Sequence, residues 1–280
     1  MKNSLLYASL VALMIVVQLD ARAAEESTGD LAAAAQNPIA NMRSLPFQNN
    51  TSFDVGPGEG TINVLNIQPV IPLKLNEKWN LVTRTIVPVI YADSDVLNVE
   101  GLPDLPEGLG GGSEFGLGDV NFTGFFVPAK PAKVTWGVGP SINMPTATDD
   151  LLGTEQWSIG PSVVVLVTPK PWVIGGLVRQ LWSVAGEDDR QDVNQTLIQP
   201  FINYNFKGGW YLSTAPIITA NWEEDSDDRW TVPIGGGGGK IVKIGKRPTN
   251  ISVQAFYNVE APANGADWTL RLQLQLLFPK

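Results

Sequence analysis

Few side chains in this chain can do chemistry, and most of those that can are charged. The 280 residues include no His and no Cys, which excludes imidazole bases, thiolate nucleophiles, disulfides and the metal sites built from these ligands. Arg84, Asp119, Arg179 and Arg271 remain as candidates for an active site or a selectivity filter. Charges of opposite sign could equally pair with each other to satisfy a packed interior. Whether these residues form an active site, a selectivity filter or structural ion pairs depends on which elements carry them.

The C-terminal stretch WTLRLQLQLLFPK indicates what kind of element that is. Its polar positions are Thr269, Arg271, Gln273 and Gln275, and they alternate with large apolar residues between positions 268 and 278. Alternation with period two is typical of a strand with one apolar and one polar face. In a soluble sandwich the apolar face would cover a core. In an outer-membrane barrel it would face lipid, and the polar face would line the interior.

The N-terminus is typical of a cleaved secretory signal. Residues 1–23 begin with a basic position, continue with an apolar run at 5–17 and end on the small-residue pattern Ala-Arg-Ala. Their removal takes away two basic residues and one acidic residue, so the net charge changes from −9 to −10. An acidic, exported chain is a poor partner for nucleic acid, because phosphate binding needs clustered Lys and Arg. No later apolar run approaches the roughly 20 residues of a membrane helix.

Turns divide the remaining chain into twelve predicted strands. Short basic turns alternate without exception with longer, mostly acidic stretches. The short turns are 74–78, 130–133, 169–171, 207–209 and 245–248; the long stretches are 57–60, 93–114, 147–155, 185–192, 223–228 and 260–267. This pattern predicts an all-β fold, a transmembrane antiparallel up-and-down β-barrel of about 12 strands over residues 45–280. The predicted strands are 45–55, 61–73, 79–92, 116–128, 134–145, 156–168, 172–184, 193–206, 210–221, 229–244, 249–259 and 268–278.

Tryptophan placement favours the membrane alternative. All nine tryptophans lie near predicted strand ends: Trp79, Trp136, Trp157, Trp172, Trp182, Trp210, Trp222, Trp230 and Trp268. Trp172 and Trp182 would share one face and lie about 25 Å apart along the membrane normal, the height of a lipid-facing band. A soluble sandwich has no reason to sort its indoles in this way, whereas the two interfaces of a membrane do. We therefore predict two aromatic girdles, with water inside the barrel.

Strand parity then assigns an inward face that is polar with isolated charges. That face comprises Asn80, Arg84, Asp119, Asn121, Thr123, Ser141, Asn143, Ser158, Ser162, Arg179, Ser213, Thr219, Ser252, Gln254, Asn258, Arg271, Gln273 and Gln275. Val82, Leu177, Leu181 and Phe256 point the same way, so a mixed interior is expected rather than a wide ionic pore. The residues expected to set the selectivity of the interior are Arg84, Asp119, Arg179, Arg271, Gln273 and Gln275.

Two motifs suggest ligand sites without meeting their requirements. IGGGGGK at 234–240 lacks the first Gly of a phosphate-binding loop, and Ile241 replaces the Ser or Thr that would bind magnesium. The glycines are better explained by a sharp bend or a close neighbour. EEDSDD at 223–228 lacks the spacing of a calcium loop and is interpreted as a solvated loop. No catalytic, metal or cofactor site is predicted.

Residues 24–44 precede the predicted barrel and form a periplasmic N-terminal segment. Leu31 to Gln36 favours a short helix, with Asp30 as its N-cap and Asn37-Pro38 as its stop. The segment could be a tail or a small plug, and the sequence does not choose between them.

The ordered phrases of the chain resemble a known family. NPIANMRSLPFQNN, GLGDVNF, WGVGPSINMPTATDD, LGTEQWSIGPS, WSVAG, QPFINYNF, GWYL, WTVPIGGGGGK and LRLQLQLLFP are similar to the bacterial outer-membrane family named for the meta-pathway of phenol degradation, whose members are often labelled transporter or neuromedin U. The resemblance covers nearly all of the mature chain. It implies a β-barrel and a channel for small compounds, with aromatic compounds among the candidates. The chain departs from outer-membrane barrels that end on an aromatic residue, because Pro279 and Lys280 follow Phe278.

These observations lead to a functional hypothesis with two rivals. We expect a channel for small molecules in the outer membrane of a Gram-negative-type bacterium, with outer-membrane lipid and the barrel-assembly machinery as partners and Phe278 as the assembly signal. A structural or surface-binding barrel, plugged by its own side chains, is the first alternative. An enzyme is the second, and we predict none, because the Ser–His chemistry of outer-membrane phospholipases needs a His.

Overall fold

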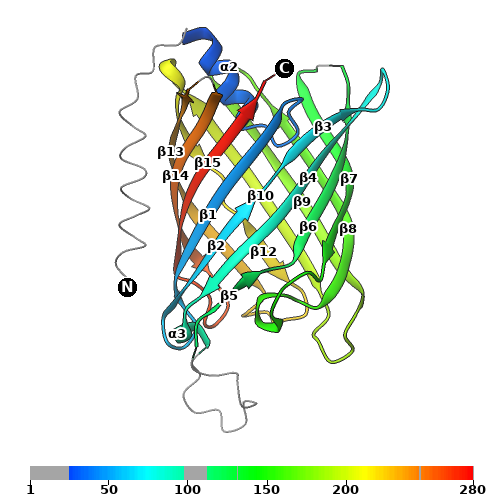
Figure 1. Cartoon of the computed structure of the whole chain (residues 1–280), viewed down its shortest axis with the longest axis vertical. Helices are drawn as coiled ribbons and strands as arrows, with labels where there is room; N and C mark the ends of the chain where they lie inside the picture. The colour runs from blue at the N-terminus through cyan, green and yellow to red at the C-terminus, as the bar shows by residue number, and fades with distance from the viewer. Residues whose placement is uncertain (1–24, 98–111, 131, 246, 280) are drawn as a thin grey trace.

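The described residues form one closed antiparallel β-barrel (Figure 1). The computed structural model describes residues 25–97, 112–130, 132–245 and 247–279; the predicted signal at 1–23 lies outside them. Fifteen strand segments make 12 passes, because three passes are each broken into two segments, so the predicted 12-stranded barrel is confirmed. The unbroken passes are β1 (Arg43–Val55), β4 (Trp79–Ala92), β7 (Val134–Met144), β8 (Gln156–Val167), β9 (Trp172–Gly186), β10 (Asn194–Asn205), β13 (Trp230–Ile244), β14 (Arg247–Glu260) and β15 (Trp268–Phe278).

Three predicted strands are interrupted in the middle. Residues 61–73 divide into β2 (Gly60–Ile67) and β3 (Val70–Lys74), residues 116–128 into β5 (Glu114–Leu117) and β6 (Val120–Pro128), and residues 210–221 into β11 (Trp210–Thr214) and β12 (Ile218–Asn221). Pro69 and Pro216 lie in the first and third breaks, and a proline has no N–H to give to a ladder. In the second break, a side chain on Gly118 would collide with Ile90. The predicted continuity was therefore wrong at these points.

Pairing of the first and last strands closes the barrel. β1 and β15 run antiparallel over 11 residue pairs, from Arg43 opposite Phe278 to Phe53 opposite Trp268. Closure matters because an open sheet edge would leave backbone N–H and C=O groups without partners, which lipid cannot supply. Next to the Arg43–Phe278 pair, the buried side chain of Leu277 packs with Met42 and Ile241.

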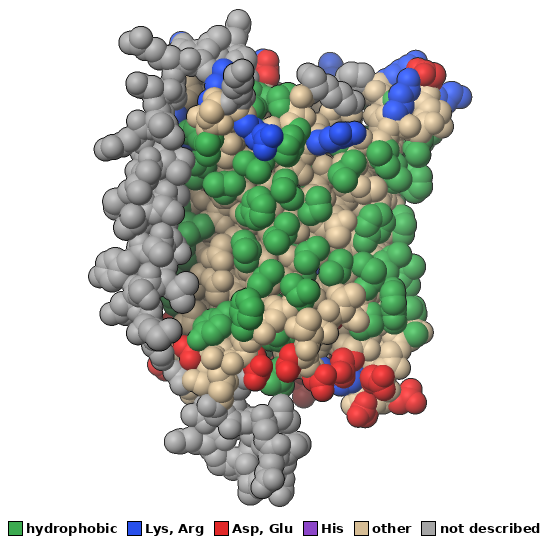
Figure 2. Space-filling model, viewed as in Figure 1, with side chains coloured by type: hydrophobic (Ala, Val, Ile, Leu, Met, Phe, Trp, Pro, Cys, Tyr) green, Lys and Arg blue, Asp and Glu red, His purple; other side chains and the backbone are tan. Residues whose placement is uncertain are grey.

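The two ends of the barrel differ in charge, and an apolar belt lies between them (Figure 2). Lys and Arg gather at the end with the short turns, here called the short-turn end, and Asp and Glu at the opposite long-loop end. The belt contains large side chains that are at least 38% exposed, among them Ile159, Val163, Val165, Ile174, Val178, Leu212, Val253 and Tyr257. Soluble proteins rarely expose a continuous apolar surface of this kind. The inward and outward faces therefore follow the parity predicted from the sequence.

Within the part of the chain that the structure describes, two short α-helices lie outside the sheet, besides the 3-10 turns η1 (Asp150–Leu152) and η2 (Lys207–Gly209). Helix α2 (Glu25–Ala35) lies at the short-turn end and α3 (Ser94–Leu97) at the long-loop end (Figure 1). The predicted helix started too late, because α2 begins at Glu25 and Asp30 is inside it rather than at its N-cap. Asp30 instead forms an ion pair with Lys170, with Oδ1 and Nζ 2.7 Å apart. No helix among the described residues is long and apolar enough to cross a membrane.

The glycine run of β13 makes room for a neighbouring side chain. A Cβ added to Gly239 would collide with the hydroxyl of Tyr211, which lies on the paired strand β11. That hydroxyl donates a hydrogen bond of 2.7 Å to Asn250 Oδ1 inside the barrel. Close approach of a neighbouring element, one of the two explanations that the sequence left open, therefore accounts for Gly239.

Deleting residues 276–280 is expected to prevent stable folding of the barrel. The deletion removes three of the 11 pairs between β1 and β15 and the buried Leu277 side chain. The measurement is gel mobility with and without boiling, which separates a folded barrel from the unfolded chain. Deleting only residues 279–280 is the matched control, because all 11 pairs remain. A heat-modifiable band from the larger deletion would contradict the importance of this seam.

Candidate functional site

Inside the barrel a buried polar group lies toward the long-loop end and a buried apolar cluster toward the short-turn end, where polar side chains such as Asn250 are buried as well. Asn121, Thr123 and Ser141 are buried and linked by hydrogen bonds, including one of 2.7 Å between the two hydroxyls. Ten apolar residues form a buried cluster at the other end, here called the apolar cluster: Ile39, Val70, Val82, Phe125, Val127, Val164, Leu166, Val173, Leu177 and Phe201. The apolar cluster therefore fills part of the interior at the short-turn end.

The N-terminal segment supplies part of that filling. Ile39, between α2 and β1, is 3% exposed and belongs to the apolar cluster. Gln36 and Asn205 exchange two amide hydrogen bonds of 2.9 and 3.1 Å. Gln275 Nε2 donates to the carbonyl of Ala35 at 3.4 Å. Residues 36–42 are thus held inside the short-turn end by both apolar and polar contacts.

Three of the predicted selectivity residues converge in the interior. Arg271 is 6% exposed, and its Nε donates to Asn50 Oδ1 at 2.9 Å. Its Nη1 donates to the carbonyl of Ala215 at 2.8 Å. Arg84 Nη2 donates to Gln68 Oε1 at 2.7 Å. Its charge is close enough to that of Arg179 and to that of Arg271 to repel each of them.

Two cavities are lined by these arginines. The inner cavity has a volume of about 160 Å³ and is lined by Arg84, Arg271 and part of the N-terminal segment. Both other predicted residues of β15, Gln273 and Gln275, also line it. The outer cavity, of about 490 Å³, lies at the long-loop end, and its lining includes Arg179. Arg84 and Arg271 therefore line the inner cavity, and Arg179 lines the outer one.

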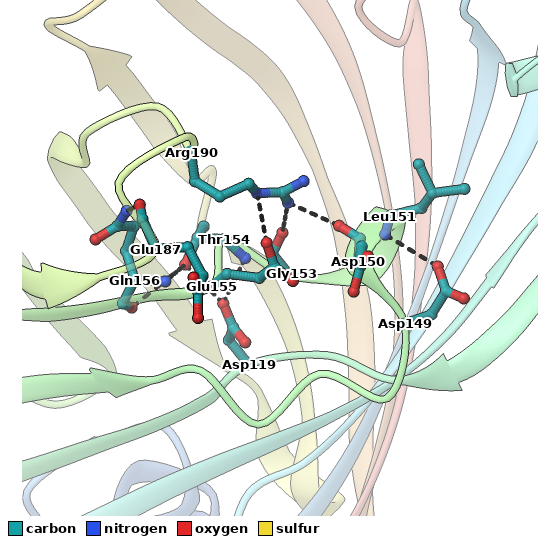
Figure 3. A network of polar contacts seen from close by, with 10 residues as sticks. All are labelled: Asp119, Asp149, Asp150, Leu151, Gly153, Thr154, Glu155, Gln156, Glu187 and Arg190. Carbon is teal, nitrogen blue, oxygen red and sulfur yellow. Dashed lines mark hydrogen bonds and ion pairs between the residues drawn. The ribbon is translucent and has the colours of Figure 1, made fainter. Parts of the chain in front are cut away.

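Asp119, the predicted acidic member of the site, is engaged elsewhere (Figure 3). Its carboxylate accepts hydrogen bonds of 2.8 Å from both the backbone N–H and the hydroxyl of Thr154. It also accepts from the backbone N–H groups of Thr146 and Ala147 at 3.1 and 3.2 Å. Among the ion pairs of the described residues, none joins Asp119 to an arginine. Asp119 thus secures the loop that follows β7.

Arg190 fastens the same loop from the next long loop, after β9. Its Nε lies 3.0 Å from Glu155 Oε2, and its Nη2 donates to the carbonyls of Asp150 and Gly153 at 2.7 and 2.8 Å (Figure 3). The hydrogen bond between the Glu155 and Asp150 carboxyls, with smaller effects of desolvation and repulsion, raises the pKa of Glu155, while Arg190 opposes the rise. Because the pKa of Glu155 is higher in the folded protein, protonation of Glu155 stabilises the fold at low pH. This stabilisation is lost as the pH rises through the raised pKa.

The predicted girdle residues lie at both ends of the exterior. Trp136, Trp157, Trp172, Trp182, Trp210, Trp222 and Trp268 are exposed, and Trp79 and Trp230 are half-buried. Trp79 packs edge-on against Trp136, with ring centroids 5.8 Å apart. Phe278, the predicted assembly signal, is 37% exposed and has the guanidinium of Arg247 over its ring at 4.6 Å.

Several residues of the interior were not in the predicted site. Gln68 is the partner of Arg84, and Ala215 offers its carbonyl to Arg271. Both immediately precede the prolines of broken passes, and an X-Pro pair inside a strand-like run was the only available signal. Ile39 and Gln36 were missed because nothing in their local pattern shows that they enter the barrel. Among the described residues, no group of three or more potential ligands is placed to hold a metal ion.

Comparison with known proteins relates the chain to others by fold. No protein-family model and no curated protein matches the sequence. The crystal structure of an outer membrane channel from Pseudomonas putida F1 is similar, with a TM-score of 0.64 and 14% identity over 85% of this chain and 96% of that one. The CymD monoaromatic hydrocarbon channel has a TM-score of 0.47 and 10% identity, and the match covers 92% of this chain and 93% of that one. The outer membrane phospholipase A of Escherichia coli has a TM-score of 0.43 and 13% identity, and the match covers 89% of this chain and 98% of that one. The first likeness shows that this chain has the fold of outer-membrane barrels.

Replacing Asp119 with Ala is expected to loosen the loop at 147–155. The change leaves three backbone N–H groups without their acceptor, at a cost of about 1–3 kcal/mol for each one that remains unsatisfied. The measurement is the rate at which elastase cuts the folded protein within 147–155, read by mass spectrometry. Asp188→Asn removes a charge from an exposed position of a neighbouring loop and serves as the control. Equal cutting rates in both variants would contradict the anchoring role.

Proposed function

We propose that this chain is an outer-membrane channel for small molecules. The observation that carries the proposal is a closed barrel with an apolar outside whose interior holds two cavities, one lined by Arg84 and Arg271 and the other by Arg179. Membership of the phenol-degradation family is part of the proposal; it is supported by the sequence phrases and agrees with the fold likeness to an outer membrane channel. The resemblance also suggests aromatic compounds as solutes.

The proposed orientation puts the long, acidic loops outside the cell and the short, basic turns in the periplasm, as is usual for such barrels. Export by a cleaved signal at 1–23 belongs to the same proposal. An epitope inserted after Asp188, in an exposed loop, is expected to bind antibody on intact cells. The control is an epitope after Lys207, in the turn between β10 and β11. Binding at the second position but not at the first would reverse the orientation.

A plugged, structural barrel is the second candidate, and one observation favours it. Ile39 is buried in the apolar cluster, so the N-terminal segment narrows the short-turn end from inside. Passage of a solute would then require residues 36–42 to shift. An enzyme finds less support, because the chain has no His to activate a serine nucleophile.

Conductance in a planar bilayer tests the channel. The refolded wild-type chain is expected to conduct, with a reversal potential in a salt gradient that indicates a preference for anions. A charge inside the barrel acts at short range, whereas the acidic loops are screened beyond about 8 Å at physiological salt. Replacing Arg179 and Arg271 together with Ala is therefore expected to move the reversal potential toward cations.

Three outcomes separate the alternatives in this experiment. No conductance from the wild type or from a variant that lacks residues 25–42 would favour the plugged barrel. Conductance only after that deletion would identify the N-terminal segment as the obstacle. An unchanged reversal potential in the double variant would show that the arginines do not set selectivity. Arg43→Gln, at an exposed position next to the short-turn end, is the matched control for loss of one positive charge.

A further inference from the structure

The interior arginines carry positive charge that the described residues do not balance. Arg84 and Arg271 line the inner cavity, and no Asp or Glu lines it with them. In the ion pairs of the described residues, neither they nor Arg179 takes part. Burying a charge without a partner is costly. A site of this kind is completed by an anion that comes from solution.

The three arginines are carried by strands spread around the circumference, and Arg84 acts electrostatically on both of the others. Arg271 is on β15, Arg84 on β4 and Arg179 on β9. From β15 to β4 is three passes, from β4 to β9 four, and from β9 back to β15 five, which together make the 12 of the barrel. Chance neighbours on one strand pair would not be distributed in this way. Arg84 and Arg271 thus line one cavity from strands that lie three passes apart.

Hydrogen-bond donors remain unused on these arginines. A guanidinium has five N–H donors, and in the hydrogen bonds among the described residues Arg84 uses Nη2 alone, to Gln68. Arg271 commits Nε and Nη1. Arg179 Nε is buried and has no partner. The planar fork of a guanidinium matches the two oxygens of a carboxylate.

The inner cavity also has an apolar wall. Leu177, Phe201 and Val70 line it and belong at the same time to the apolar cluster. Phe256 lies beneath the guanidinium of Arg271, with Cζ 4.7 Å from the ring centroid. The cavity volume of about 160 Å³ is close to the roughly 150 Å³ of an engineered apolar cavity that holds benzene. The space therefore suits one ring, with a charged group at one side of it.

We propose that the inner cavity binds a small organic carboxylate with an apolar body of about one ring. Its carboxylate is held by Arg84 and Arg271, with Arg179 on the approach from the outer cavity, and its ring lies against Leu177 and Phe201. This proposal names a solute class for the proposed channel. Its claim about transport rests on the proposed channel function, whereas its claim about binding does not. An inorganic anion would leave the apolar wall without a contact. A neutral aromatic compound would leave the arginines without a counter-charge.

Equilibrium dialysis of the refolded full chain in detergent, with radiolabelled benzoate as the probe, tests the site. Specific binding above that of empty micelles is expected, with displacement by unlabelled benzoate but much less by benzyl alcohol, acetate or sulfate. Arg84→Gln is expected to weaken binding by about tenfold or more, since a hydrogen bond to a charged group contributes about 1.5–3 kcal/mol. Arg84→Lys keeps the charge but loses the fork, so an intermediate affinity is expected. Arg43→Gln is expected to bind as the wild type does.

Heat-modifiable mobility establishes that each variant is folded before it is compared. Displacement by sulfate as effectively as by benzoate would overturn the organic-anion site, and displacement by benzyl alcohol would overturn the need for charge. A folded wild type that conducts but binds no benzoate would refute this site and leave the channel proposal standing. Benzoate binding by a protein that does not conduct would support the site and count against the channel.

Discussion

Closure of the sheet between β1 and β15 is the constraint on which the rest of this structure depends. Every strand then has two neighbours, so the backbone can be fully hydrogen-bonded while the outside is apolar. Closure with 12 passes also has a consequence for the interior. About eight strands make a barrel that side chains alone can fill, so a barrel of 12 encloses more space than they occupy. The N-terminal segment, the apolar cluster and the two cavities are different ways of using that space.

Interruptions of the sheet supply several contacts of the interior. Where β2 gives way to β3, Gln68 meets Arg84. Where β11 gives way to β12, the carbonyl of Ala215 is free of the ladder and accepts from Arg271. Where β5 gives way to β6, Asp119 turns to the loop after β7. A regular strand would keep its backbone groups in the ladder, so the break after β11 leaves the Ala215 carbonyl available to Arg271.

Electrostatics divides the molecule into regions of opposite sign. The long-loop end is acidic (Figure 2). The deeper interior carries Arg84 and Arg271, and no Asp or Glu of the described residues lines the inner cavity with them. An anion approaching from that end meets repulsion first and attraction afterwards. The acidic side chains are partly satisfied among themselves, as in the network of Asp150, Glu155 and Arg190. The interior charges lack such partners, and this difference separates a structural network from a binding site.

The sequence by itself determined the barrel, because strand periodicity, turn charge and tryptophan position are local patterns that each pass repeats. Trp79 begins β4 and Trp268 begins β15, as the alternation predicted. The convergence of Arg84, Arg179 and Arg271 was only partly predictable: parity indicated their side of the sheet but not their height or their neighbours. Only the tertiary structure decided that Asp119 belongs to a loop anchor and that Ile39 enters the apolar cluster. The physical reason is that parity is a property of one strand, whereas these contacts depend on register around a closed sheet and on a segment that carries no periodic signal.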